Sequence, residues 1–167
     1  MAKRSAKHGH GGTPALVALE ASGVPHTVHP YEHDPASDLG YGLEAAQAIG
    51  VDPSLVLKTL VTSADGTLVV AVLPVDRTLD LKALAHAVGA KRAVLAEHAV
   101  AERATGYVVG GISPLGQRQT HPTVVDASVL GADVVYVSAG RRGVDVGLAP
   151  QDLVRLTGAT TAPVARA

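Results

Sequence analysis

A short glycine-rich stretch, Thr105–Gln117, holds the residue types from which an active site could be built. It reads TGYVVGGISPLGQ and places a serine between a glycine pair and a proline. A hydrolase nucleophile elbow reads G-x-S-x-G and uses the N–H that follows the serine in its oxyanion hole. Here the second glycine is one position late, and Pro114 after Ser113 has no N–H. The stretch therefore predicts a tight turn between two strands, or a turn whose Gly110 and Gly111 amides approach a ligand.

Two charged side chains are further candidates for a binding site. Lys58 stands in the run LKTL, among apolar residues and a threonine. It is either an edge-strand lysine facing water or a cation held in a cleft for phosphate or carboxylate. Asp145 follows two arginines and a glycine, and is either a salt-bridged turn residue or a site carboxylate. The spacing establishes no paired carboxylates and no Ser-His-Asp arrangement.

The histidines near the N-terminus raise the question of a metal. His29, Tyr31 and His33 alternate along an extended stretch, a spacing that can place ligands on one face. No HExxH or comparable pattern accompanies them, so we predict neither a metal site nor a cofactor. The chain has no cysteine, which excludes disulfides, thiolate metal sites and cysteine nucleophiles, and we expect the cytoplasm as its compartment.

Composition limits the class of protein. At 167 residues the chain fits one domain, which we place at 13–167 after a disordered arm at 1–12. It has no Phe and no Trp, so Val, Leu, Ile and Ala must fill the core. No apolar run approaches the roughly 20 residues of a membrane span. The net charge of −1 argues against holding nucleic acid by bulk electrostatics.

Capping signals and periodicity predict a mixture of helices and strands. The five expected helices are Pro14–Ser22, 42–50, 81–89, 96–106 and a final one at 150–158 that closes the chain. Strands are expected at 26–31, in a hairpin around Ala64-Asp65-Gly66, and near Tyr107–Val109, Thr123–Asp126, Val134–Ser138 and Val144–Gly147. Because strands and helices do not alternate strictly, we predict an α+β fold around a mixed sheet.

Six motifs in this order resemble the YbaK/EbsC family. They are TPA at Thr13–Ala15, YEHDP at Tyr31–Pro35, KTL at Lys58–Leu60, LDLKALA at Leu79–Ala85, the glycine stretch at Thr105–Gln117, and YVSAGRRGVDV at Tyr136–Val146. The similarity runs from about Thr13 to Gly158. It implies a compact α+β domain with a mixed, barrel-like sheet surrounded by helices, related to the editing domain inserted in bacterial prolyl-tRNA synthetases.

The resemblance also implies an activity and a site. The activity is deacylation of misacylated tRNA, in this branch Cys-tRNA(Pro), with prolyl-tRNA synthetase as a transient partner. The implied catalytic residues are Lys58, Gly110 and Gly111. The implied substrate-binding residues are Tyr31, Tyr41, Thr59, Ile112, Ser113, Pro114, Ser138 and Asp145. Where close relatives carry Phe after YEHDP, this chain has Leu39-Gly40-Tyr41 with an apparent one-residue insertion, so Tyr41 is expected to take the aromatic role.

The resemblance further implies that the cysteine thiol of the substrate attacks its own ester carbonyl, so that the protein supplies no nucleophile. In that case Ser113 shapes the loop and does not attack. Two alternatives remain open at this point. The chain could hydrolyse Ala- or Ser-tRNA with a bound water, or it could be a module that binds aminoacylated tRNA ends or a synthetase without chemistry.

Overall fold

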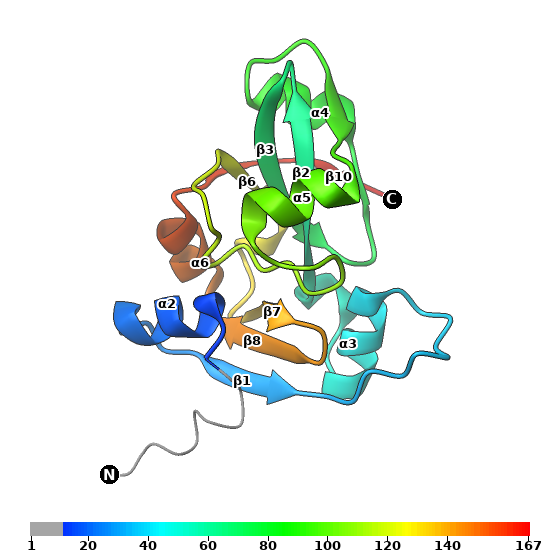
Figure 1. The fold of residues 1–167 in the computed structure, drawn as a ribbon, viewed down its shortest axis with the longest axis vertical. Helices are drawn as coiled ribbons and strands as arrows, with labels where there is room; N and C mark the ends of the chain where they lie inside the picture. Colours follow the sequence, from blue (N-terminus) through cyan, green and yellow to red (C-terminus); the bar gives the residue numbers. More distant parts are fainter. Residues whose placement is uncertain (1–11) are drawn as a thin grey trace.

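The computed structural model describes residues 12–167, so the predicted arm lies outside the described residues except for Gly12. The helices are α2 (Pro14–Ser22), α3 (Tyr41–Ile49), α4 (Leu81–Ala87), α5 (His98–Thr105) and α6 (Pro150–Thr157). The strands are β1 (Thr27–Pro30), β2 (Leu57–Ala64), β3 (Thr67–Pro74), β4 (Thr78–Leu79), β5 (Ala93–Leu95), β6 (Thr123–Asp126), β7 (Val135–Arg141), β8 (Val144–Leu148), β9 (Thr160–Ala162) and β10 (Ala165–Arg166). This arrangement confirms the predicted α+β class (Figure 1).

Local capping chemistry sets the helix ends. The Thr13 hydroxyl accepts the Leu16 N–H at the start of α2, and the Asp80 carboxylate accepts the Ala83 N–H at the start of α4. Side-chain caps of this kind satisfy amides that have no partner within the helix. Gly23 ends α2 in the left-handed conformation, which glycine adopts without steric cost. The predicted starts and ends of these two helices therefore hold to within about two residues.

The strands form three sheets among the described residues. The largest has the order β5-β2-β3-β6-β9, in which β6 runs parallel to both β3 and β9. The second has the order β1-β8-β7 and is antiparallel, and β4 pairs with β10 in the third. A single parallel bridge between Val56 and Tyr136 joins the start of β2 to β7. The sheet is therefore mixed, as predicted, but residues 12–167 form no closed barrel.

The main core lies between the two larger sheets and is aliphatic. It takes Leu19 from α2, Val72 from β3, Val137 from β7 and Leu153 from α6, each fully buried. A second cluster, around Leu84 of α4, covers the other face of the five-stranded sheet. Figure 1 shows β1, β7 and β8 in the lower part of the molecule and β2 and β3 rising above them. The two sheets thus meet near the start of β2.

The strand expected near Tyr107–Val109 is absent, and this prediction was wrong. The segment after α5 is a loop in which the Tyr107 hydroxyl donates to the carbonyl of Leu115 at 2.6 Å. The loop is closed again where the Arg118 N–H donates to the Thr105 carbonyl at 2.9 Å. The β propensity of the valines in this stretch is overridden by these longer-range hydrogen bonds. They hold the segment as a loop that pairs with no strand.

Four strands were not predicted. β4 lies between β3 and α4, β5 occupies residues that precede α5, and β9 and β10 follow α6, which therefore does not close the chain. The last two are short, and the buried carboxylate of Asp126 fixes them by accepting the N–H groups of Val164 and Ala165. None of the helices within residues 12–167 is long and apolar enough to cross a membrane.

Candidate active site

A cavity of about 380 Å³ lies where β2 loses one of its neighbours. β2 pairs with β3 along its whole length, but with β5 only from Thr62 onward. The last bond on that side runs from the Ala96 N–H to the Val61 carbonyl at 3.0 Å. The edge of β2 from Leu57 to Leu60 is thus open, and the cavity lies along it.

The walls are largely aliphatic and the polar groups are few, as in most small-molecule sites. Eight of the eleven residues implied by the family resemblance line the cavity, namely Tyr31, Tyr41, Lys58, Thr59, Gly110, Ile112, Ser138 and Asp145. They come from six segments that are distant in sequence. The remaining three, Gly111, Ser113 and Pro114, are buried beside the cavity and do not line it.

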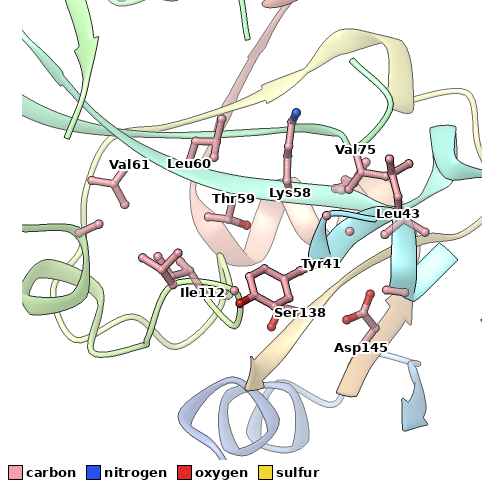
Figure 2. Close-up of a pocket in the computed structure, with 18 of the residues that line it drawn as sticks. Tyr41, Leu43, Lys58, Thr59, Leu60, Val61, Val75, Ile112, Ser138 and Asp145 are labelled. Atoms are coloured by element: carbon pink, nitrogen blue, oxygen red, sulfur yellow. The ribbon is translucent and has the colours of Figure 1, made fainter. Parts of the chain in front are cut away.

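Neighbouring residues of β2 point to opposite sides of the strand. Figure 2 shows Thr59 on the side of Tyr41 and Ser138, while Lys58 extends to the other side. The Lys58 ammonium donates to the carbonyl of Arg77 at 2.6 Å. Burial lowers the pKa of Lys58, and the negative charge of Asp76 opposes that effect. The cavity therefore extends around the open edge of β2. The Lys58 ammonium lies on one side of this strand, and Thr59, Tyr41 and Ser138 lie on the other side.

The Thr59 hydroxyl is the one buried side-chain polar atom without a hydrogen-bond partner among the described residues. A buried hydroxyl without a partner costs free energy, about 1–3 kcal/mol. It faces the cavity side of β2, toward Tyr41 and Ile112 (Figure 2). The hydroxyl is thus available to a ligand that enters the cavity.

Asp145 and Ser138 form the closed, polar end of the cavity. They face each other directly across β7 and β8. Asp145 is only 5% exposed, and burial raises its pKa to about 6. Burial, and secondarily the charge of Asp145, raises the pKa of Tyr31 to about 12. The backbone fixes Tyr31 here, because its N–H donates to the Gly143 carbonyl at 2.7 Å.

The glycine pair forms a tight turn on the opposite wall. The Gly111 N–H donates to the Val108 carbonyl at 2.9 Å and is used within the turn. Gly110 has a φ of +95°, and its N–H has no acceptor among the described residues. A Cβ on Gly111 would lie 2.8 Å from the Cα of Arg141. Both positions thus require glycine, and only the Gly110 amide is available to a ligand.

Ser113 is fully buried and is part of the loop. Its hydroxyl oxygen accepts the Leu115 N–H at 3.2 Å, and its carbonyl accepts the Gln117 side-chain amide at 2.9 Å. No solvent path reaches its hydroxyl. The Ser113 hydroxyl is thus bonded within the loop and does not line the cavity.

Two side chains that organise the site were not singled out from the sequence. Arg142 donates to the Val109 carbonyl at 2.6 Å and stacks on the Tyr41 ring at 4.7 Å. Glu44, in the first turn of α3, accepts the Asp34 N–H and contacts His33, both at 2.7 Å. The backbone N–H of Asp34, and then the bond to His33, lower the pKa of Glu44. Neither role has a local sequence signal, since each partner is distant in the chain or in an irregular loop.

His26, His29 and His33 have separate partners and do not converge. His26 bonds the Val24 carbonyl, His29 bonds the Thr27 hydroxyl, and His33 bonds Glu44. Within residues 12–167 no three His, Asp or Glu side chains are grouped as a metal site would require.

Residues 41–156 match the model of the aminoacyl-tRNA editing domain. The chain belongs to this family. A curated relative from Enterococcus faecalis, named "Putative Cys-tRNA(Pro)/Cys-tRNA(Cys) deacylase EbsC", is 36% identical over 146 residues, which cover 87% of this chain and 88% of the relative. The YbaK/EbsC assignment made from the motifs is thereby confirmed.

Solved structures agree with the fold of this editing domain. One is a hypothetical protein that is 27% identical, with a TM-score of 0.82 over 92% of this chain and all of that one. Another is "a putative trans-editing enzyme for prolyl tRNA synthetase", 24% identical, with a TM-score of 0.81 and full coverage of both chains. The second likeness shows the fold alone.

The editing-domain cavity offers binding groups and no activated nucleophile. Its one lining serine, Ser138, accepts the Gly140 N–H at 3.1 Å, and no histidine is bonded to it. A serine without an adjacent base is a weak nucleophile. The cavity presents a carboxylate, hydroxyls, backbone amides that include that of Gly110, and a cation at its rim.

Proposed function

We propose that this chain is a trans-acting deacylase that clears Cys-tRNA(Pro), with the substrate's own thiol as the nucleophile. The supporting observation is a cavity whose closed end carries Asp145 and Ser138, in a protein with no cysteine and with its loop serine buried. Membership of the editing-domain family makes an aminoacyl-tRNA the substrate class. The name of the curated relative supports cysteine as the amino acid.

The closed end of the cavity binds the amino acid. Asp145 is a carboxylate in an aliphatic setting, and the α-ammonium group of an aminoacyl ester is the complementary charge. Binding that ammonium offsets the desolvation that raises the Asp145 pKa. The Ser138 hydroxyl, opposite Asp145, adds a neutral donor and acceptor.

The ester carbonyl lies between β2 and the glycine turn. In the reaction the thiol sulfur bonds to the carbonyl carbon and the ester C–O bond breaks. The thiol proton passes to the ribose oxygen, and a cyclic thiolactone leaves for hydrolysis by water. The Thr59 hydroxyl and the Gly110 N–H are free donors for the developing oxyanion. In other enzymes one such donor lowers the activation free energy by about 3–4 kcal/mol. Holding the thiol and the carbonyl in the reactive geometry can lower it by up to roughly 7–11 kcal/mol.

Lys58 acts on the other side of the β2 edge. Its ammonium, now bonded to the Arg77 carbonyl, lies at the rim where the terminal nucleotide of the tRNA would leave the cavity. It therefore holds a ribose or phosphate oxygen of that nucleotide. We expect Lys58→Ala to lose most deacylation with its circular dichroism unchanged, and Lys82→Ala, an exposed lysine of α4, to retain it. A well-folded Lys58→Ala protein with wild-type turnover would remove this residue from the site.

A substrate panel tests the mechanism. Cys-tRNA(Pro), Ala-tRNA(Pro), Ser-tRNA and S-alkylated Cys-tRNA(Pro) are each incubated with the pure protein. We expect rapid release from Cys-tRNA(Pro) and nearly none from the alkylated ester. Hydrolysis of the alkylated or alanyl ester at a similar rate would establish attack by water. Binding of all four without cleavage would establish a binding module.

Recognition of the tRNA body is assigned to prolyl-tRNA synthetase as a transient partner. The net charge of −1 provides few phosphate contacts, and few contacts give weak, salt-sensitive affinity. We expect the free protein to cleave cysteinyl esters of several tRNAs at similar rates, and added synthetase to favour tRNA(Pro). Strong discrimination by the free protein at physiological salt would contradict this assignment.

A further inference from the structure

Arg142, in the turn between β7 and β8, joins two walls of the cavity. Its guanidinium donates to the carbonyl of Val109 at 2.6 Å and stacks over the ring of Tyr41, 4.7 Å from the centroid. Val109 belongs to the glycine turn, and Tyr41 is the first residue of α3. Both line the cavity. One planar cation thus connects wall segments that have no backbone hydrogen bond to each other.

The contact leaves no spare room. A Cβ placed on Gly110 would lie 2.5 Å from the Arg142 Nε and 2.7 Å from a ring carbon of Tyr41. The Tyr41 ring also meets His33, with centroids 5.3 Å apart. Glu44 fixes His33 in turn at 2.7 Å. The ring therefore contacts Arg142, His33 and the bare backbone of the glycine turn.

We propose that Arg142 is a specificity-determining positioning residue, which pins Tyr41 against the Val109–Gly110 turn and so limits the size of the aminoacyl group that the cavity admits. This inference rests on the proposed deacylase function. Tyr41 is 39% exposed, so its ring has space to turn toward solvent once Arg142 no longer holds it. A planar arginine suits this role because one face stacks while an edge donates, which lysine cannot do at once.

The kinetic test compares two esters that differ in bulk and share the thiol. Chemically charged cysteinyl-tRNA(Pro) and penicillaminyl-tRNA(Pro), whose amino acid carries two extra methyl groups beside the sulfur, are given to wild type and to Arg142→Ala. We expect kcat/KM for the penicillaminyl ester, divided by kcat/KM for the cysteinyl ester, to rise at least about tenfold in the variant. Tenfold is the lower end of the discrimination that one methylene gives in a hydrophobic pocket. Arg166→Ala, an exposed arginine of β10, should leave the ratio unchanged.

Arg142→Lys separates positioning from simple charge. If Arg142 pins Tyr41, the lysine variant should show a raised ratio as well, because it lacks the planar fork. An equal fall in kcat/KM for both esters in Arg142→Ala, restored by Arg142→Lys, would show that the residue only attracts tRNA phosphates, and would overturn the proposal.

A second readout needs no substrate. The chain has four tyrosines, so fluorotyrosine labelling gives four ¹⁹F signals, and Tyr41→Phe assigns the one of interest. In Arg142→Ala the Tyr41 signal should move toward the position of a solvent-exposed tyrosine, while the buried Tyr107 signal stays in place. An unmoved Tyr41 signal refutes the positioning role. Failure of wild type to cleave either ester would instead refute the deacylase function and leave this readout intact.

Discussion

Replacing Asp145 by asparagine should stabilise the protein, because burial raises the pKa of this carboxylate, and should impair deacylation, because we propose that the carboxylate binds the amino acid. Burial raises its pKa from 3.8 to about 6 in the folded state. One pKa unit corresponds to about 1.4 kcal/mol, so above pH 6 the ionised carboxylate costs the folded state about 3 kcal/mol. Asparagine has nearly the same shape and carries no charge. The Asp145→Asn protein should therefore be more stable than wild type at pH 8, by up to about 3 kcal/mol.

The sign follows from proton linkage. Because the folded pKa lies above the unfolded one, the folded state binds more protons between pH 4 and 6. The contribution of Asp145 to the stability of wild type is therefore fully present below about pH 4 and is lost as the pH rises through about 6. The advantage of Asp145→Asn should grow over the same interval and be small in acid.

Urea unfolding followed by far-UV circular dichroism, at pH 4, 6 and 8 and constant ionic strength, measures the difference. Asp126 provides a matched control, since it is also buried, at 2% exposure, but its carboxylate accepts N–H groups from the chain. Asp126→Asn should lose about 1.5–3 kcal/mol, the worth of hydrogen bonds to a charged group. An Asp145→Asn protein that is less stable than wild type at pH 8, or whose difference does not change with pH, would refute the reasoning.

Three further predictions concern the loops around the cavity. Glu44→Gln should reduce stability at neutral pH and not in acid, because a lowered folded pKa gives stability that is lost as pH falls; urea midpoints at pH 7 and 3 would show this, and a pH-independent loss would contradict it. Gly111→Ala should abolish deacylation and lower Tm by several degrees, because its Cβ would meet the backbone of Arg141 at 2.8 Å; unchanged Tm and turnover would mean that the turn adapts. Ser113→Ala should keep substantial turnover and lose about 1 kcal/mol in urea unfolding, since only a buried loop hydroxyl is removed; an inactive, folded protein would make Ser113 catalytic.

The sequence alone determined features whose causes are local. Thr13 and Asp80 mark helix starts because a side-chain oxygen caps amides two or three residues away. The Asp65-Gly66 turn fixes the β2–β3 hairpin, and the pairing found there runs through all eight residues of each strand. The order and spacing of short motifs were enough to identify the family. The family in turn indicated eight of the residues that line the cavity.

Only the tertiary structure decided where those residues act. Tyr107–Val109 can form a strand only if a neighbouring strand is available to pair with it. The buried hydrogen bond from the Tyr107 hydroxyl to the Leu115 carbonyl instead holds the segment in a loop. The open edge of β2 beside Lys58 depends on where β5 stops pairing, which no local pattern records. The Arg142 stack on Tyr41 likewise joins residues about a hundred positions apart, through a contact whose strength depends on geometry that only the folded chain supplies.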